Sequence, residues 1–411
     1  MKIKYSLPEI VVFSVAALLP TYLIRFHIGP LPTTVLEIVL VVGILFLIFN
    51  LFCHPRAHVS RFGSRHVGGP INNGSSTDQV KIGFPMSLGN DKLLLIGSSL
   101  ILVATVIGII VAPDKRAALG IAKAYFWEPM ALSWLIIAAK PDKEKIWRAA
   151  LGGFALSAFV VVIYGLLQYA HPSLIPATWT SERRITSVFD YPNAVALYLA
   201  PLVALLLSSP ITVALAFFAV VVIVLAKSAG GMVAVAAALF WLGIIKNKTR
   251  VATIIAAITA ILVVLLLPAA AGLRDQILMR DWSGRVHLIG WKESLAMLKD
   301  HPLFGAGLDG FKTVVAPYHH AQGVEIFQYP HNLFLTIWSE LGLLGLAGFV
   351  LVLIWFFKKT FRRYSLPPTP YSLLFLAAAM LAILVHGLVD VPYFKNDLAM
   401  MFWLFITTVA L

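Results

Sequence analysis

Long, continuous apolar runs alternate with short polar segments along almost the whole chain. A helix of about 20 residues crosses the hydrocarbon core of a bilayer, and only helices or closed barrels satisfy their backbone hydrogen bonds there. Because the runs lack the strict alternation of barrel strands, they predict transmembrane helices. The twelve predicted spans cover residues 8–24, 33–52, 93–112, 118–139, 149–170, 192–208, 211–227, 229–245, 251–268, 333–356, 371–389 and 396–411.

Composition supports a lipid environment and gives the chain an orientation. Hydrophobic residues make up 60% of the chain, charged residues 12%, and the mean hydropathy is +0.88, whereas soluble domains carry about 25% charged residues. The net charge of +13 reflects basic loops rather than a nucleic-acid site. More than half of the 32 Lys and Arg residues lie in 1–6, 53–92, 140–148, 246–250 and 357–363. We therefore expect these loops and both termini on the cytoplasmic side of a bacterial inner membrane.

The predicted organisation has three parts. Residues 1–268 form nine spans, of which the segment Met1–Ile24 is expected to be a helix rather than a cleaved signal peptide. A polar, glycine-containing stretch near 53–92 predicts a cytoplasmic linker. Residues 269–332 form a periplasmic loop with an amphipathic helix over 282–299, and residues 333–411 form the last three spans. Cys53 is the only cysteine, which excludes an intramolecular disulfide and a multi-cysteine metal site.

The two outer segments, about 171–191 and 269–332, concentrate arginines, namely Arg183, Arg184, Arg280 and Arg285. Arginine binds phosphate oxygens through a planar fork of donors and stays charged. Two such residues would hold a lipid-linked pyrophosphate at the membrane boundary and stabilise it as a leaving group. The alternative is local ion pairing, of Arg183 or Arg184 with Glu182, of Arg280 with Asp281 and of Arg285 with Glu293.

His331 precedes the tenth span, within Tyr329-Pro330-His331-Asn332. A histidine can accept a proton from a hydroxyl group at neutral pH, which makes His331 a candidate general base. A capping or interfacial role at a helix start is the alternative. Asp390, near the outer end of the eleventh span, is a weaker candidate because a helix-end hydrogen bond explains it equally well.

The chain resembles the O-antigen ligase and polymerase family of bacterial membrane glycosyltransferases over residues 180–360, most specifically from Ser283 to Gly345. The motifs that carry the resemblance are Arg184-Ile185-Thr186-Ser187-Val188-Phe189 with Pro192-Asn193, Ser283-Gly284-Arg285, His301-Pro302-Leu303-Phe304-Gly305-Ala306-Gly307, His331-Asn332 and Glu340-Leu341-Gly342-Leu343-Leu344-Gly345. It implies an all-α, GT-C-like integral membrane glycosyltransferase that is inverting and metal-independent and uses no cofactor.

At the matching motif positions of this chain, the resemblance implies that His331 is the base and that Arg184 and Arg285 hold undecaprenyl pyrophosphate. Arg183, Arg280, Asn332 and Asn193 are further substrate-binding candidates, and Arg183 could replace its neighbour Arg184. Many relatives have a Ser-Arg-Gly run after the seventh span, where this chain has Lys227-Ser228-Ala229. Any phosphate contact there falls to Lys227.

Lys123 and Glu128 lie inside the fourth predicted span, where charges are unfavourable and usually functional. Lys123 is therefore a substrate-binding candidate, unless its side chain extends to the interface. Residues 305–310 fit the pattern G-x-G-x-x-G, but the strand and βαβ unit that this nucleotide-binding motif requires are missing. No Asp-x-Asp pair or P-loop is present, so a soluble nucleotide sugar is not the expected donor.

The sequence thus predicts an O-antigen ligase that moves undecaprenyl-pyrophosphate-linked O-antigen onto lipid A-core at the periplasmic face. A polymerase or a protein O-oligosaccharyltransferase would use the same donor with another acceptor. A polyprenyl-lipid transporter or flippase is the alternative of another class. It should show repeated halves or paired broken helices, and no internal repeat is visible in the sequence.

Overall fold

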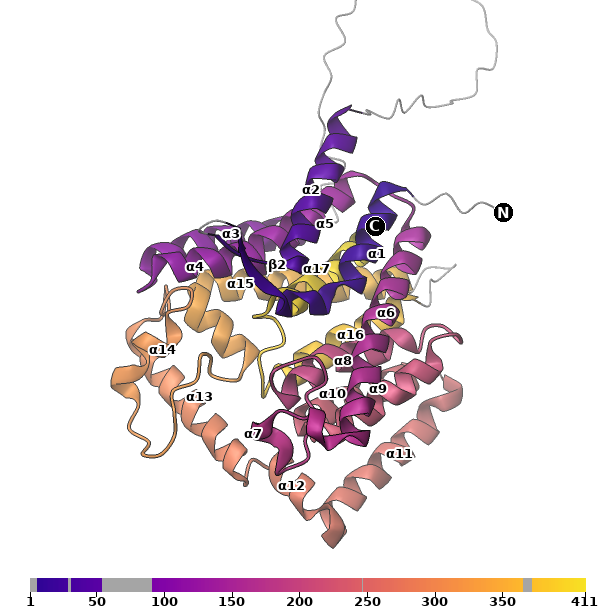
Figure 1. The fold of residues 1–411 in the computed structure, drawn as a ribbon, viewed down its shortest axis with the longest axis vertical. Helices are drawn as coiled ribbons and strands as arrows, with labels where there is room; N and C mark the ends of the chain where they lie inside the picture. Colours follow the sequence, from indigo (N-terminus) through magenta and orange to yellow (C-terminus); the bar gives the residue numbers. More distant parts are fainter. Residues whose placement is uncertain (1–5, 29–30, 54–90, 246, 365–371) are drawn as a thin grey trace, which may run out of the picture.

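The computed structural model describes residues 6–28, 31–53, 91–245, 247–364 and 372–411 (Figure 1). Its α-helices are α1 (Leu7–Ala17), α2 (Val35–Cys53), α3 (Lys92–Val111), α4 (Lys115–Ile121), α5 (Glu128–Ala138), α6 (Lys143–Ala170), α7 (Ala177–Thr180), α8 (Pro192–Leu206), α9 (Val213–Leu225), α10 (Ala229–Ile245), α11 (Asn247–Leu266), α12 (Ala271–Ile277), α13 (Trp282–Asp300), α14 (Phe311–Val314), α15 (Leu333–Tyr364), α16 (Ser372–His386) and α17 (Asn396–Ala410). Short 3₁₀ segments are η1 (Leu19–Leu23), η3 (Pro172–Leu174), η4 (Pro268–Ala270) and η5 (Ala316–Tyr318), while η2 (Ala122–Trp127) is a π-helix.

The protein is an all-α membrane protein, as predicted. Five described helices, α2, α3, α6, α11 and α15, are long and apolar enough to cross a bilayer. Six further apolar helices are shorter, and every predicted span overlaps one or more described helices. Twelve crossings therefore remain a prediction. The predicted linker near 53–92 lies almost entirely outside the described residues.

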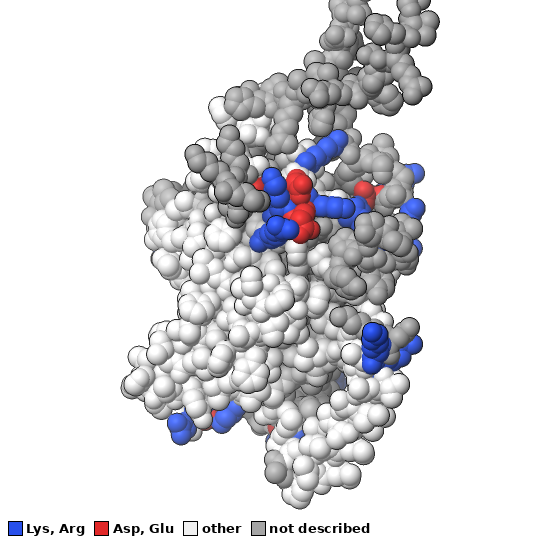
Figure 2. Space-filling view, turned by 90° about the vertical axis from the view of Figure 1, so that its right-hand side faces the viewer, with Lys and Arg blue, Asp and Glu red and all other residues white. Residues whose placement is uncertain are grey.

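Much of the apolar surface faces outward. Phe49, Phe217 and Leu266 are 61%, 64% and 72% exposed, and none of the apolar window of α11 is buried. On the face shown in Figure 2, charged side chains gather near the upper end and at the edges, with an uncharged belt between them. An exposed apolar belt of this extent needs lipid as its solvent.

The interior is built from α8 and α17, whose residues are almost all buried, and from α16, of which about two thirds is buried. Around them, α3 packs along α15 through two glycines, since a Cβ on Gly97 would overlap the Gly348 carbonyl oxygen and the reverse is also true. Small residues at such contacts let helix backbones approach closely, which stabilises helix association in lipid.

The structure differs from the prediction in the first and fourth spans. The first span was predicted over 8–24, but α1 ends at Ala17 and Pro20 directs the chain into η1. A short antiparallel hairpin, β1 (Arg25–Ile28) with β2 (Leu31–Thr34), follows before α2. The fourth span carries the π-helical turn η2 around Lys123. Such turns are rare and often occur at functional sites.

Residues 269–332 form an ordered cap that contains the predicted amphipathic helix as α13. Asp281 begins this helix by accepting a hydrogen bond from the Gly284 amide (2.9 Å). Beyond α13, the segment 303–308 is bonded to the membrane helices through its backbone. The bonds run from Ala306 N to Ser339 O (2.6 Å), from Leu308 N to Gly108 O (3.1 Å) and from Leu343 N to Leu303 O (3.0 Å).

Glycines permit this close approach of the cap to α3 and α15. Gly305, Gly307 and Gly342 all have positive φ, and a Cβ on any of them would overlap backbone atoms of the neighbouring segment. Gly342 breaks α15 with φ 67° and ψ −173°. The buried carboxylate of Glu340 accepts the Asp309 and Phe311 amides. The motifs at 301–307 and 340–345 therefore fix the cap to the membrane helices.

Candidate functional site

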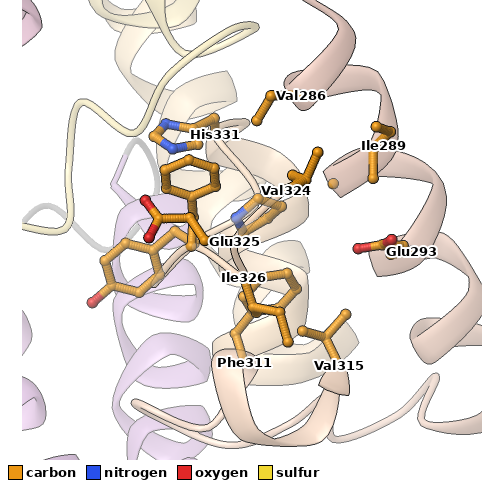
Figure 3. Close-up of a pocket in the computed structure, with 13 residues that line it drawn as sticks. Val286, Ile289, Glu293, Phe311, Val315, Val324, Glu325, Ile326 and His331 are labelled. Atoms are coloured by element: carbon orange, nitrogen blue, oxygen red, sulfur yellow. The ribbon is translucent and has the colours of Figure 1, made fainter. Parts of the chain in front are cut away.

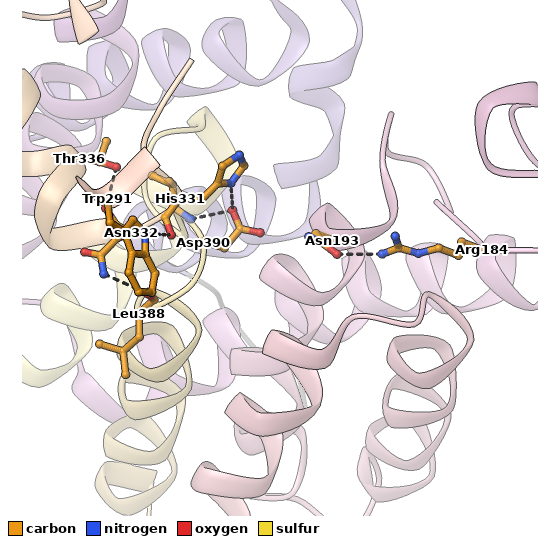
Figure 4. A network of polar contacts seen from close by, with 9 residues as sticks. Arg184, Asn193, Trp291, His331, Asn332, Thr336, Leu388 and Asp390 are labelled. Atoms are coloured by element: carbon orange, nitrogen blue, oxygen red, sulfur yellow. Dashed lines mark hydrogen bonds and ion pairs between the residues drawn. The ribbon is translucent and has the colours of Figure 1, made fainter. Parts of the chain in front are cut away.

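His331 and Asp390 form a pair at the junction of the cap and the membrane helices (Figure 4). His331 lies two residues before α15, and Asp390 lies in the loop between α16 and α17. Nδ1 of His331 is 3.4 Å from Oδ1 of Asp390. The His331 side chain is 31% exposed whereas that of Asp390 is 8% exposed. The carboxylate is therefore a buried support for an accessible imidazole.

Electrostatics strengthen this pair. Burial by itself raises the pKa of Asp390, but the hydrogen bond and charge of His331, with a smaller effect of His386, bring it down to about 2. The Val391 amide also donates to Oδ1 of Asp390 (2.8 Å). Asp390 is thus ionised at neutral pH, and it favours a proton on Nδ1 of His331. Nε2 then remains free to accept another proton.

Aromatic groups from the cap enclose the His331 ring. The rings of His287 and Phe327 lie with their centroids 5.1 Å and 5.0 Å from it, and Trp291 donates from Nε1 to the His331 carbonyl oxygen at 3.4 Å. Burial lowers the pKa of His287, and the neighbouring His331 lowers it further. A neutral His287 adds no second charge beside the candidate base.

The pocket between α13, α14 and residues 324–331 reaches His331 (Figure 3). Its volume is about 20 Å³, which is room for about one water molecule. This pocket is too small for a sugar. A substrate must therefore approach His331 from outside it.

The backbone at His331 is unusual, with φ of 50°. Non-glycine residues in this region carry roughly 1–3 kcal/mol of strain and cluster at functional sites. Arg183, Ser187 and Lys227 share this conformation, with φ between 48° and 53°. Seven described non-glycine residues have positive φ. Four of them therefore lie in the segments around Arg184, Lys227 and His331, which contain the residues predicted from the sequence.

Asn332 positions the start of α15. Its Oδ1 accepts the Phe334 and Leu335 amides (3.1 and 3.0 Å), and its Nδ2 donates to the Leu388 carbonyl oxygen (3.0 Å). The side chain thus caps the helix and connects it to the loop that carries Asp390. A contact between Asn332 and substrate remains a prediction.

Arg184 is the centre of a second cluster (Figure 4). Its guanidinium donates to Asn193 Oδ1 and to the Ala226 carbonyl oxygen, each at 3.0 Å, and lies 5.2 Å from the Trp179 ring centroid. The predicted ion pair with Glu182 is present at 3.8 Å. The side chain is 18% exposed. Asn193 and the end of α9 therefore hold the guanidinium in a fixed orientation.

Lys227 and Arg183 lie beside this cluster. Lys227 donates from Nζ to the Glu182 carbonyl oxygen (2.6 Å), and Arg183 lies 5.9 Å from the Tyr169 ring centroid. The structure thus brings four sequence-predicted residues, Arg183, Arg184, Asn193 and Lys227, into one region.

Arg285 and Arg280 are exposed on the cap. Arg285 contacts the Trp282 ring at 5.7 Å and lies two residues before His287 on α13. Glu293, its predicted local partner, is paired with His319 at 3.0 Å instead. No ion pair of Arg280 with Asp281 occurs in the described part of the chain.

Lys123 is paired with two carboxylates. Its Nζ is 3.4 Å from Glu37 Oε1 and 3.8 Å from Glu128 Oε1. The side chain is nevertheless 43% exposed. Local pairing therefore accounts for its charge, and its predicted role in substrate binding stays a prediction.

No direct contact joins Arg184 or Arg285 to His331 within the described ranges. The segments are linked instead through Lys395, whose ammonium contacts Phe189 and Tyr191 of the Arg184 loop. Lys395 and His287 were not predicted from the sequence, because neither lies in a recognisable motif. Asp390 was only a weaker candidate, because a helix-end hydrogen bond explained it equally well, and its partner His331 lies 59 residues away in the sequence.

Within the described residues, no group of three or more His, Cys, Asp or Glu side chains could hold a metal ion. The fold and the site together define an integral membrane protein with a helical cap, in which a histidine and several arginines lie near one end of the helices.

The family model for O-antigen ligase matches residues 214–350. This match is consistent with the O-antigen ligase family that the sequence motifs predicted. It runs from α9 through the cap into α15 and includes Arg285 and His331, whereas Arg184 and Asp390 lie outside it. A comparison with curated proteins gave no match to this chain. The family supports a transferase activity of the ligase or polymerase type on lipid-linked polysaccharide.

Proposed function

We propose that this protein is an O-antigen ligase. It transfers O-antigen polysaccharide from undecaprenyl pyrophosphate to a hydroxyl group of lipid A-core. The observation that carries this proposal is the contact of His331 with the buried, ionised Asp390 inside a chain of this family.

In the proposed reaction, Nε2 of His331 takes the proton of the acceptor hydroxyl. The oxygen attacks the anomeric carbon of the donor from the side opposite the pyrophosphate, so a new glycosidic bond forms as the bond to pyrophosphate breaks. The configuration at that carbon is inverted, and undecaprenyl pyrophosphate leaves. Asp390 positions the imidazole and stabilises its protonated form, in the manner of other histidine–carboxylate pairs.

Arg184 and Arg285 would bind the pyrophosphate and stabilise the charge that develops on it as it leaves. Arg184 is already oriented by Asn193, which reduces the entropy lost on binding. Arg285 is free of ion pairs within the described residues and lies on the same helix as His287, next to His331. Arg183, Arg280 and Lys227 would add a positive field around the same headgroup.

The helix directions support a periplasmic site. The helix α6 begins at the basic segment 143–148 and ends at Ala170, where Gln168 accepts the Thr186 and Ser187 amides just beyond Arg184. The helix α15 begins beside His331 and ends at the basic residues 358–363. The site is therefore at the opposite end of both helices from their basic ends. Basic ends favour the cytoplasm, which would leave the site outside.

The test is glycan transfer by purified protein in liposomes that contain undecaprenyl-pyrophosphate-linked O-antigen and lipid A-core. We expect glycan on lipid A-core, and we expect His331→Ala to abolish it while the protein stays folded. His319→Ala is the matched control. His319 is also paired with a carboxylate, but its partner is Glu293 and not Asp390. Full activity of His331→Ala would contradict the base assignment.

Two further results would contradict ligation. Growth of the lipid-linked glycan without transfer to lipid A-core would indicate a polymerase. Movement of the donor lipid between leaflets without any transfer would indicate a flippase.

A further inference from the structure

Lys395 lies between the two clusters described above, at the point where the loop from α16 enters α17. Its Nζ is 5.2, 5.3 and 5.0 Å from the ring centroids of Tyr22, Phe189 and Tyr191. These rings come from two further segments, η1 and the loop that follows Arg184. Lys395 thus connects the His331–Asp390 side of the site to the Arg184 side.

The ammonium of Lys395 has no hydrogen-bond acceptor. Among the described residues, no oxygen atom lies within hydrogen-bond or ion-pair distance of its Nζ. Aromatic rings attract a cation, but they do not replace the oxygen acceptors that three N–H donors require. Burial accordingly lowers the pKa of Lys395. The other half-buried lysine beside an aromatic ring, Lys359, differs because Asp91 lies 2.7 Å from its Nζ.

The carboxylates around Lys395 favour its charged form more strongly than the neighbouring cation Arg25 disfavours it. Arg25 of β1 is close enough to disfavour the charged form of Lys395, so two cations share this region. Carboxylates of Asp397, Asp390 and Asp190 act on Lys395 from beyond ion-pair distance. Of these, Asp390 is already bonded to His331. The three N–H donors of Lys395 therefore remain available to a ligand.

We propose that Lys395 is a phosphate-binding residue that contacts the headgroup of the lipid substrate between Arg184 and His331. The proposal rests on the proposed function, because that function requires a diphosphate at this place. The shared chemistry is a phosphate oxygen that accepts hydrogen bonds from an ammonium without an acceptor of its own. Its source is the diphosphate of the donor or a phosphate of the acceptor lipid, and the two are separated by experiment.

The experiment compares Lys395→Met with the unsubstituted protein in binding to detergent-solubilised undecaprenyl pyrophosphate and, separately, to lipid A-core. Removing a charged hydrogen bond should weaken binding on the order of ten- to a hundredfold. Weaker binding of undecaprenyl pyrophosphate alone identifies the donor, and weaker binding of lipid A-core alone identifies the acceptor. Lys395→Arg should restore most of the affinity. Lys312→Met is the control, since Lys312 is exposed on the cap. Unchanged affinity of Lys395→Met for both lipids would overturn the proposal.

A second measurement uses the unsubstituted protein, so its result does not depend on whether a variant folds. Bound undecaprenyl pyrophosphate or lipid A-core should slow the acetylation of Lys395 several-fold relative to Lys312, as measured by mass spectrometry. Equal protection of both lysines would overturn the proposal. Transfer that is unaffected by Lys395→Met, together with unchanged binding, would defeat this inference alone. Lys395-dependent binding without any transfer by the unsubstituted protein would defeat the proposed function alone.

Discussion

Replacing Asp390 by asparagine tests the histidine–carboxylate pair without changing its size. The pKa of Asp390 falls from the usual 3.8 to about 2. A difference of this size corresponds to roughly 2 kcal/mol between its two protonation states. Most of the stabilising contribution comes from His331. The same interaction stabilises the protonated imidazole that forms when His331 takes the acceptor's proton.

Loss of about 2 kcal/mol from the transition state corresponds to roughly a 30-fold lower kcat. An asparagine can also turn its amide toward Nδ1 and favour the wrong tautomer, which in other histidine–carboxylate pairs brings the loss to about 10⁴-fold. We therefore expect Asp390→Asn to lower kcat between these limits, with little change in the KM of either lipid.

The assay is single-turnover transfer in liposomes from pH 5 to pH 9, with the folded fraction measured by size-exclusion chromatography. Glu293→Gln is the matched control, because it breaks the other histidine–carboxylate pair of the cap, with His319. A kcat of Asp390→Asn within threefold of the unsubstituted protein would refute the positioning role. A reduced activity that is fully accounted for by a smaller folded fraction would indicate that Asp390 acts only on the fold.

Three further predictions follow from the same contacts. Arg184→Lys should raise the KM for the donor roughly tenfold with a smaller effect on kcat, because a lysine lacks the planar fork that makes both of the Arg184 hydrogen bonds. An unchanged KM for the donor would contradict this prediction. Gly342→Ala should destabilise the protein by several kcal/mol, since its φ of 67° and ψ of −173° are accessible essentially to glycine alone, whereas Gly120→Ala, with open space around it, should leave the melting temperature within a few degrees. The pKa of Asp390 is lowered in the folded state, so its ionised form stabilises the fold above about pH 4. This contribution, on the order of 2 kcal/mol, is lost as the pH falls toward 2. The difference in thermal stability between the unsubstituted protein and Asp390→Asn should therefore shrink between pH 4 and pH 2.

The helices could be predicted from the sequence because lipid imposes a local rule. Each spanning segment must satisfy its own backbone and present apolar side chains, so hydropathy over about 20 residues is sufficient. The amphipathic helix α13 was also predicted from a local pattern, because its apolar residues recur with the period of a helix. Local interruptions were harder to predict. Pro20 ends α1 early, and no simple pattern announces the π-helical turn around Lys123.

The candidate site was predictable only where motifs marked it. His331, Arg184 and Asn193 belong to motifs, and the structure gives each of them a defined set of partners. The glycine motifs around Gly305 and Gly342 were part of the resemblance, but their physical role in joining the cap to the helices required the backbone geometry. Neither positive φ nor a backbone overlap can be derived from residue spacing.

Asp390 and Lys395 illustrate what local patterns leave out. Both lie in the nine-residue loop between α16 and α17, and each acts on segments distant in sequence, at His331 in one case and at Tyr22 and Tyr191 in the other. Charged residues at helix ends usually interact with the helix dipole or with solvent, so their sequence position alone favours an ordinary structural role. The contacts change that assessment, because a carboxylate with a strongly lowered pKa and an ammonium without an acceptor lie five residues apart in one loop. A loop that both orients the candidate base and presents a cation to the lipid headgroup would couple donor binding to the readiness of His331. Substitutions in this loop should therefore affect donor binding and proton transfer together, whereas substitutions on the cap should affect them separately.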